Sequence, residues 1–370
     1  MKVLFIAAEY PKPAGDKRMR RLLYIMKQFK LQGHELYFMG FSDTKPEDKG
    51  SLFKTVALLP PPAHLSDFRQ HPDTVCKEKL FRETLALKPD LLFVFGIEAA
   101  VYAPFETKIP ALGDFLRCEY IAVQKENSGG GMFKKLTGAF EWSKTAAIET
   151  GLASKFSTLF LPRERDVYYL NKQSALNLTV LPDAIDTEAF DTEDWMPDEN
   201  RLLFTGSVTE EGNLNAVRYY RDHFADEFYK RGVTLYVTGR YLESQKNTLF
   251  NEKVVPLGFV RDIREAFKTS QAVVIPIMGG IGAVGKITEA MAAGVPVIAT
   301  KDGAEGLRVT PADECILIAN TPADMVAAWE KLQDRDFADR LRKNARQIVE
   351  DNYSWKANGK LLKDAVSAAK

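Results

Sequence analysis

Short apolar runs recur along this chain, and stretches that favour helices separate them. In the first half these runs are Val3–Ala8, Glu35–Phe41, Val56–Leu59, Leu91–Gly96, Ala111–Phe115 and Ser157–Leu161. A strand covered on one face alternates apolar and polar side chains, whereas a strand buried on both faces has no need to. The pattern therefore predicts an α/β fold with a parallel, doubly wound sheet.

The same pattern starts again near residue 201. The runs of the second half are Leu202–Gly206, Thr234–Gly239, Val254–Phe259, Ala272–Ile277, Val295–Thr300 and Cys315–Ala319. Because 370 residues are too many for one ordinary core, we expect two domains. We predict an N-terminal domain over residues 1–185, a connection over 186–200 that includes an acidic, proline-containing stretch, and a C-terminal domain over 201–354.

Composition excludes several classes of protein. Fifty basic residues balance fifty acidic ones, which disfavours a nucleic acid partner. The three cysteines, Cys76, Cys118 and Cys315, have no metal-ligand spacing and predict reduced thiols in a cytoplasmic protein. No apolar run reaches the roughly 18 residues of a membrane span, and the N-terminus leads directly into a strand rather than a signal peptide.

The segment richest in chemical signals is 276–300, in which a strand leads into a glycine-rich loop and then a helix. Gly280 and Gly282 allow the backbone to approach a phosphate, and the amides and dipole at the helix start favour an anion. Lys286 lies at the helix end where a cation opposes the dipole, which favours a role in ligand binding. Glu289, one turn further on the same face, could accept hydrogen bonds from two ribose hydroxyls.

The same loop permits two other interpretations. Lys286 and Glu289 could form an exposed ion pair beside a tight turn. Gly280, Gly285 and Lys286 also fit the G-x-x-x-x-G-K part of a P-loop, but Ile287 stands where a P-loop needs Ser or Thr for magnesium. This substitution disfavours an ATPase or GTPase.

Several segments together resemble the family 4 glycosyltransferases, which have the GT-B fold. They are 276–307, Thr205-Gly206-Ser207, 254–262, 181–190, 344–355 and 10–21. The resemblance implies two Rossmann-like domains facing a central cleft. The N-terminal domain would bind the acceptor and the C-terminal domain the nucleotide-sugar donor, and a helix over 355–370 would cross back to complete the N-terminal domain. It also implies transfer of a sugar, with retention, from a nucleotide diphosphate sugar such as a UDP-sugar to a glycan, lipid-linked or other glycoconjugate acceptor in polysaccharide biosynthesis.

The resemblance also assigns the donor site. It places the ribose on Glu289 and the diphosphate on the loop and its lysine, and it places the base beside two other loops. The implied donor-binding residues are Gly280, Ile281, Gly282, Lys286, Glu289, Gly206, Ser207, Gly239, Arg240, Phe259 and Val260. Two of them depart from the family pattern. Ile281 replaces a glutamate beside the donor sugar, and Ser207 replaces an arginine on the diphosphate.

Asp114, at the end of a predicted strand, is the candidate catalytic residue of the first domain. Its carboxylate could orient or deprotonate an acceptor hydroxyl, or it could instead cap the helix predicted over Phe115–Val123. Arg117 and Glu119 are weaker candidates from the same segment. Gly15 and Arg18 lie in the first strand-to-helix loop, although Arg18 also fits a solvated basic helix face.

The remaining expectations concern partners and cofactors. Residues 128–136 combine glycines, lysines and apolar side chains, which fits either peripheral contact with the inner face of a membrane or a loop over the acceptor. GT-B enzymes usually need no bound metal ion, so we expect no metal and no cofactor beyond the nucleotide sugar. A non-catalytic GT-B-like scaffold and a nucleotide-sugar 2-epimerase are the alternative functions.

Overall fold

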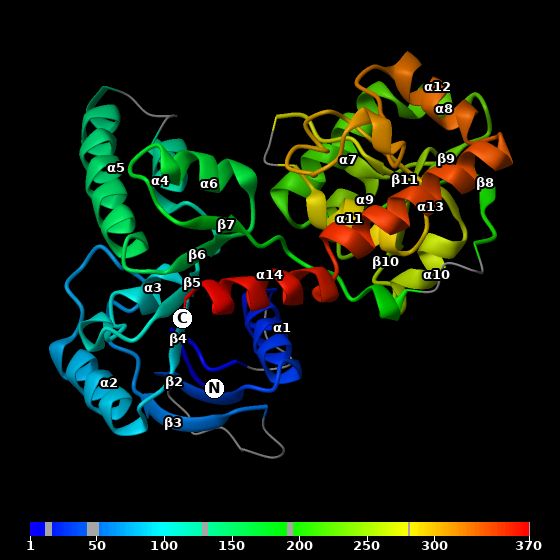
Figure 1. The fold of residues 1–370 in the computed structure, drawn as a ribbon. Helices are drawn as coiled ribbons and strands as arrows, with labels where there is room; N and C mark the ends of the chain where they lie inside the picture. Colours follow the sequence, from blue (N-terminus) through cyan, green and yellow to red (C-terminus); the bar gives the residue numbers. More distant parts are fainter. Residues whose placement is uncertain (12–16, 43–51, 128–131, 191–194, 280–281, 370) are drawn as a thin grey trace. The chain divides into compact units, whose positions relative to one another are not determined.

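The computed structural model describes residues 1–11, 17–42, 52–127, 132–190, 195–279 and 282–369 (Figure 1). The chain forms two compact units. Unit 1 contains Met1–Asp183 and Asn358–Lys370, and unit 2 contains Ala184–Ala357.

Unit 1 is built on a parallel sheet of seven strands in the order β3-β2-β1-β4-β5-β6-β7. The strands are β1 (Lys2–Ala7), β2 (Glu35–Phe41), β3 (Lys54–Leu59), β4 (Leu91–Phe95), β5 (Ala111–Asp114), β6 (Thr158–Leu161) and β7 (Leu178–Val180). The helices are α1 (Lys17–Leu31), α2 (Thr74–Leu87), α3 (Ile97–Ala100), α4 (Glu119–Asn127), α5 (Met132–Ala153), α6 (Glu164–Asn171) and α14 (Trp355–Ala368), with a 3-10 turn η1 (Phe105–Thr107).

Both faces of this sheet are covered, as the apolar runs predict. In β1, Leu4 and Ile6 belong to one apolar cluster, whereas Val3, Phe5 and Ala7 belong to another. Successive side chains of a strand point to opposite faces, so the two clusters lie on opposite sides of the sheet. The second cluster includes apolar residues of α1 and of α14 (Figure 1).

Helix α14 packs against α1 in unit 1. The Gln32 side-chain amide donates to the Gly359 carbonyl (2.9 Å), and Leu362 and Val366 lie in the same apolar cluster as α1. The predicted return of the last helix to the N-terminal domain is thus confirmed.

Unit 2 has a parallel sheet of six strands in the order β10-β9-β8-β11-β12-β13. The strands are β8 (Asp198–Phe204), β9 (Thr234–Thr238), β10 (Val254–Gly258), β11 (Ser270–Ile275), β12 (Val297–Ala299) and β13 (Leu317–Ile318). The helices are α7 (Glu211–His223), α8 (Ala225–Tyr229), α9 (Glu243–Leu249), α10 (Ile263–Lys268), α11 (Val284–Ala292), α12 (Pro322–Lys331) and α13 (Arg335–Asn352), with 3-10 turns η2 (Thr187–Ala189) and η3 (Pro311–Asp313).

The predicted connection over 186–200 differs from the structure, because its described residues lie within unit 2. Trp195 is 9% exposed, and its indole N–H donates to the Ser270 carbonyl (3.1 Å). Asp198 already belongs to β8. The large apolar indole draws this polar segment onto the core of unit 2.

Candidate functional site

The sheet of unit 2 reverses its strand order between β8 and β11. Strands β9 and β10 follow β8 on one side, and β12 and β13 follow β11 on the other. Open parallel sheets bind ligands at such a reversal, beside the carboxyl ends of the strands. The two segments that meet there are the turn after β8, which contains Gly206, and the segment from β11 to α11, which contains Gly282.

Lys286 joins these two segments. It lies in the first turn of α11, and its ammonium donates to the Thr205 carbonyl at the end of β8 (2.6 Å). The ammonium also lies 5.4 Å from the centre of the Phe204 ring. The lysine is half-buried rather than solvated. A positive charge is therefore held at the point where the strand order reverses.

Helix α11 begins there with little to offset its dipole. Its N-cap residue, Ala283, makes no side-chain capping bond, and its first turn holds no acidic residue. Helix amides left without intrahelical partners favour an anion. Glu289, one turn beyond Lys286, is exposed. Lys286 thus lies against the end of β8, and Glu289 lies one turn further along the helix at the surface.

The turns after β8 and β9 are pressed together. Gly239 has φ +100°, and a Cβ atom on it would lie 2.6 Å from the Gly206 carbonyl carbon and the Ser207 amide nitrogen. Only glycine fits this approach. The Ser207 hydroxyl donates to the Arg240 carbonyl (3.0 Å), and the Val208 amide donates to the same oxygen (3.0 Å).

The predicted base-flanking residues lie at the same edge. Phe259 follows β10 and is 78% exposed, Val260 is half-buried, and the Arg240 side chain is exposed. A large exposed aromatic ring beside a strand end is suited to stacking on a planar ligand. Gly280 and Ile281, also predicted here, lie outside the described residues.

In unit 1, the predicted residues Arg18, Arg117 and Glu119 line one pocket of about 320 Å³. Glu98, which the sequence analysis did not single out, also lines it and pairs with Arg18 (3.2 Å). Arg117 pairs with Glu119 through its Nε (2.9 Å). Gly15, the other candidate from this region, lies outside the described residues.

The structure does not support the catalytic role predicted for Asp114. Its side chain is fully buried, and it accepts from the Nε of Arg21 (2.9 Å), which is itself 4% exposed. Burial raises the pKa of this carboxyl group, while the Arg21 guanidinium acts in the opposite direction. A carboxylate enclosed in this way reaches no substrate. Its strand-end position is as predicted, but the side chain points into the protein.

Asp114 is not the predicted helix cap either, since Glu149 of α5 has that role. Its two carboxylate oxygens accept from the backbone amides of Glu119 (2.8 Å) and Tyr120 (2.9 Å) at the start of α4. The side chain is fully buried, and burial raises its pKa to about 7. A capping residue 30 positions away from the amide it caps leaves no signal in local sequence.

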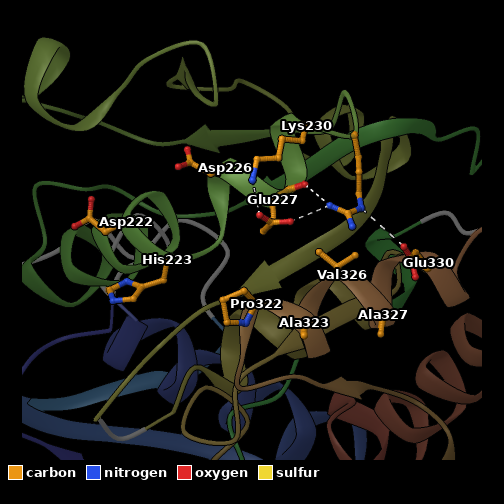
Figure 2. A pocket seen from close by; sticks show the side chains of 11 residues that line it. Asp222, His223, Asp226, Glu227, Lys230, Pro322, Ala323, Val326, Ala327 and Glu330 are labelled. Atoms are coloured by element: carbon orange, nitrogen blue, oxygen red, sulfur yellow. Dashed lines mark hydrogen bonds and ion pairs between the residues drawn. The ribbon is translucent and has the colours of Figure 1, made fainter.

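A second hollow, of about 690 Å³, lies between α7, α8 and α12 (Figure 2). Charged side chains line it, and Arg231 pairs with both Glu227 (3.2 Å) and Glu330 (3.8 Å). Its lining residues come from these helices and from the turn between α8 and β9, which leads into the amino end of that strand. Its lining includes neither the turn after β8 nor the segment from β11 to α11, where the strand order reverses, so it is not the ligand site expected for such a sheet.

Within the described residues, no three His, Cys, Asp or Glu side chains are grouped so that they could hold a metal ion. The described helices also include none with the length and apolar character needed to cross a bilayer. The predicted membrane or acceptor segment over 128–136 lies partly outside the described residues, at 128–131.

Residues 199–335 match the family model described as Glycosyl transferases group 1. No curated protein sequence matches the chain.

Several solved structures share the whole fold. Anabaena HepE in complex with UDP has a TM-score of 0.68 at 14% identity, and sucrose-phosphate synthase from Thermosynechococcus elongatus has 0.66 at 14%, each comparison covering 100% of both chains. WaaG, a glycosyltransferase involved in lipopolysaccharide biosynthesis, has 0.60 at 15%, covering 98% of this chain and 99% of that one. The chain therefore has the GT-B fold of these proteins, and its residues 199–335 are similar to the glycosyl transferases group 1 family.

Proposed function

We propose that this protein is a glycosyltransferase that takes a sugar from a nucleoside diphosphate sugar, with UDP as the nucleotide. The observation that carries the proposal is the position of Lys286. A cation at the start of α11, where the dipole disfavours it, is held against the end of β8 at the strand-order reversal of unit 2. A diphosphate bound there would gain both this charge and the amides at the start of α11, to which the N-cap residue Ala283 makes no side-chain bond.

The other predicted residues fit the rest of such a donor. Glu289 is exposed one turn along α11 and offers two carboxylate oxygens to ribose hydroxyls. Phe259 offers an exposed ring to the base. The Gly206–Ser207 backbone, which Gly239 allows to lie close by, would line the phosphate side. HepE, which shares the fold, was solved with UDP and with UDP-glucose, and this supports uracil as the base.

In the reaction, these groups would stabilise the departing nucleotide. As the bond between the sugar and the diphosphate breaks, negative charge grows on the diphosphate, and Lys286 and the α11 amides lie where they can oppose it. We propose that they take the place of a bound divalent ion. Transfer with retention to a glycan, lipid-linked or other glycoconjugate acceptor, in the cytoplasm or at the inner face of a membrane, completes the proposal. WaaG, which shares the fold, is a glycosyltransferase involved in lipopolysaccharide biosynthesis, and this supports a glycoconjugate as the acceptor.

The test is thermal unfolding of the full chain with a panel of nucleoside diphosphates and their sugars. A ligand at 100 times its Kd stabilises the folded state by about 2.7 kcal/mol, enough to raise the melting temperature clearly. UDP is expected to give the largest shift. Lys286→Ala and Glu289→Ala should each lose most of it, relative to the variant's own melting temperature without ligand.

Lys331→Ala and Glu330→Ala are matched controls. Both side chains are exposed on α12, away from the proposed donor site, so these variants should keep the full shift. If no nucleotide stabilises the native protein, a donor site is excluded, and the chain is better explained as a non-catalytic scaffold.

A further inference from the structure

The pocket of unit 1 lies where that sheet also reverses its strand order. The reversal is between β1 and β4, and the pocket is lined from α1 by Arg18, from the turn after β4 by Gly96, Ile97 and Glu98, and from the segment after β5 by 115–119. Its volume of about 320 Å³ falls within the range of small-ligand pockets, roughly 300–1,000 Å³. Both position and size therefore mark a ligand site in unit 1.

The charged groups of this pocket cancel one another. The Arg18 guanidinium lies 3.2 and 3.3 Å from the two Glu98 oxygens. The Arg117 guanidinium binds Glu119 through two hydrogen bonds of 2.9 and 3.0 Å. Two positive and two negative side chains thus give the lining no net charge, and they supply both hydrogen-bond donors and acceptors.

Glu98 is held over the pocket by the shape of the turn beneath it. Gly96 has φ +87°, and a Cβ atom on it would lie 2.6 Å from Glu98 Oε2 and 3.4 Å from the Arg18 guanidinium. Any other residue would push this ion pair away and would also strain the turn. The Glu98 side chain is only 18% exposed. If its ion pair with Arg18 were broken, the Glu98 carboxylate would be left poorly solvated.

Apolar residues complete the lining of the pocket. Phe115 and Ile97 are 1% and 3% exposed, so the half-buried Leu116 offers most of the apolar surface. A ligand with charged phosphate or carboxylate groups would have to displace Glu98 or Glu119 from its arginine. A ligand with several hydroxyls and an apolar ring face can instead use the donors, the acceptors and the apolar surface of Leu116 together.

From this we infer that the pocket binds the acceptor as an uncharged sugar unit, whose hydroxyls hydrogen-bond Glu98 and Arg18. The inference rests on the proposed transferase function, and it narrows the acceptor class to a neutral sugar rather than a phosphorylated one. Glu98 acts here as a binding and positioning residue.

Saturation-transfer NMR on the full chain tests this, with the methyl pyranosides of glucose, galactose and mannose as neutral probes and glucose 6-phosphate as the charged probe. UDP is titrated into the same samples. The native protein should bind a neutral probe more tightly than glucose 6-phosphate. Glu98→Gln should weaken that neutral probe at least about tenfold, and should strengthen glucose 6-phosphate because the pocket now carries a net positive charge.

Gly96→Ala is the second variant, since it displaces Glu98 without removing its charge, and it should also weaken the neutral probe. Glu106→Gln is the matched control. Glu106 forms an exposed ion pair with Lys77 (3.1 Å) in the same unit, outside the pocket, and its variant should bind as the native protein does.

The inference is overturned if native protein that binds UDP takes up none of the neutral probes, prefers glucose 6-phosphate, or binds a neutral probe equally after Glu98→Gln. If the native protein does not bind UDP at all, that is a different result, because it refutes the proposed donor function rather than the acceptor inference.

Discussion

The Asp114 carboxylate shows how the partner of a residue decides its role. Arg21 lies between Asp114 of β5 and the last residues of unit 1's first segment, where it donates to the Leu181 (2.7 Å) and Pro182 (3.1 Å) carbonyls. The sequence places Asp114 correctly at a strand end, but nothing in it reveals that Arg21, 93 positions away, encloses it. The buried pair therefore ties β5 to the end of that segment.

Asp114→Asn is expected to destabilise the protein strongly. It leaves the buried Arg21 charge without its closest carboxylate, and breaking a buried pair in this way costs about 3–5 kcal/mol. The measurement is the free energy of unfolding in urea.

Asp183→Asn is the control for this change. Asp183 also pairs with Arg21 (3.1 Å), but its side chain is 38% exposed, so the loss should be clearly smaller. Equal stability of the native protein and Asp114→Asn would contradict the structural role and restore Asp114 as a candidate for catalysis.

Among the elements, the strands were the most predictable. Strands buried on both faces, such as β1, β4 and β11, are nearly continuous apolar runs, so each of them can be predicted from the sequence. Strand β7 was not predicted, because its three residues are all half-buried and an edge strand leaves no such run. The start of α4 could not be predicted either, because its capping residue, Glu149, is distant in the sequence.

The turns after β8 and β9 give a prediction at this scale. Gly239→Ala should destabilise the protein and weaken UDP binding, because its Cβ would displace the Gly206–Ser207 backbone. Gly232 also has positive φ (+76°) but has open space around it. Gly232→Ala should therefore cost only the backbone strain, about 1–2 kcal/mol, and keep UDP affinity. Calorimetric titration with UDP distinguishes them, and equal UDP affinities would show that the close turn plays no part in donor binding.

The start of α4 should make stability depend on pH through Glu149. Its pKa is about 7 in the folded protein against 4.5 in the unfolded chain, because burial disfavours the charged form. The protonated Glu149 therefore contributes its full stabilisation below pH 4.5. As the pH rises through 7 this contribution is lost, and the free energy of unfolding falls by up to roughly 3 kcal/mol. Glu119 and Asp166 add to the shift.

Glu149→Gln removes this titration. The native protein should lose more stability between pH 6 and pH 8 than the variant does, as measured by urea unfolding at each pH. Parallel pH profiles for the two proteins would refute the assignment. The variant should be less stable at low pH, since a glutamine oxygen cannot cap both the Glu119 and Tyr120 amides as well as the carboxyl group does.

For the whole molecule, the two-domain fold could be predicted because the strand pattern starts again near residue 201. The site was predictable only in part. The glycine turns, Lys286 and Glu289 are local to one segment, so their spacing carries the signal. The Arg18–Glu98 pair carries no such local signal, since 80 positions separate the two residues and only the strand order of unit 1 brings them together.

If unit 2 binds the nucleotide of a sugar donor where β8 and β11 end, UDP should slow hydrogen exchange at that edge. Hydrogen exchange of the full chain, measured with and without UDP, should be slower with UDP at the turn 205–209, at 239–242 and at the first turn of α11, with no change along the groove of Figure 2. Protection confined to that groove or to unit 1, or no protection at all, would contradict it.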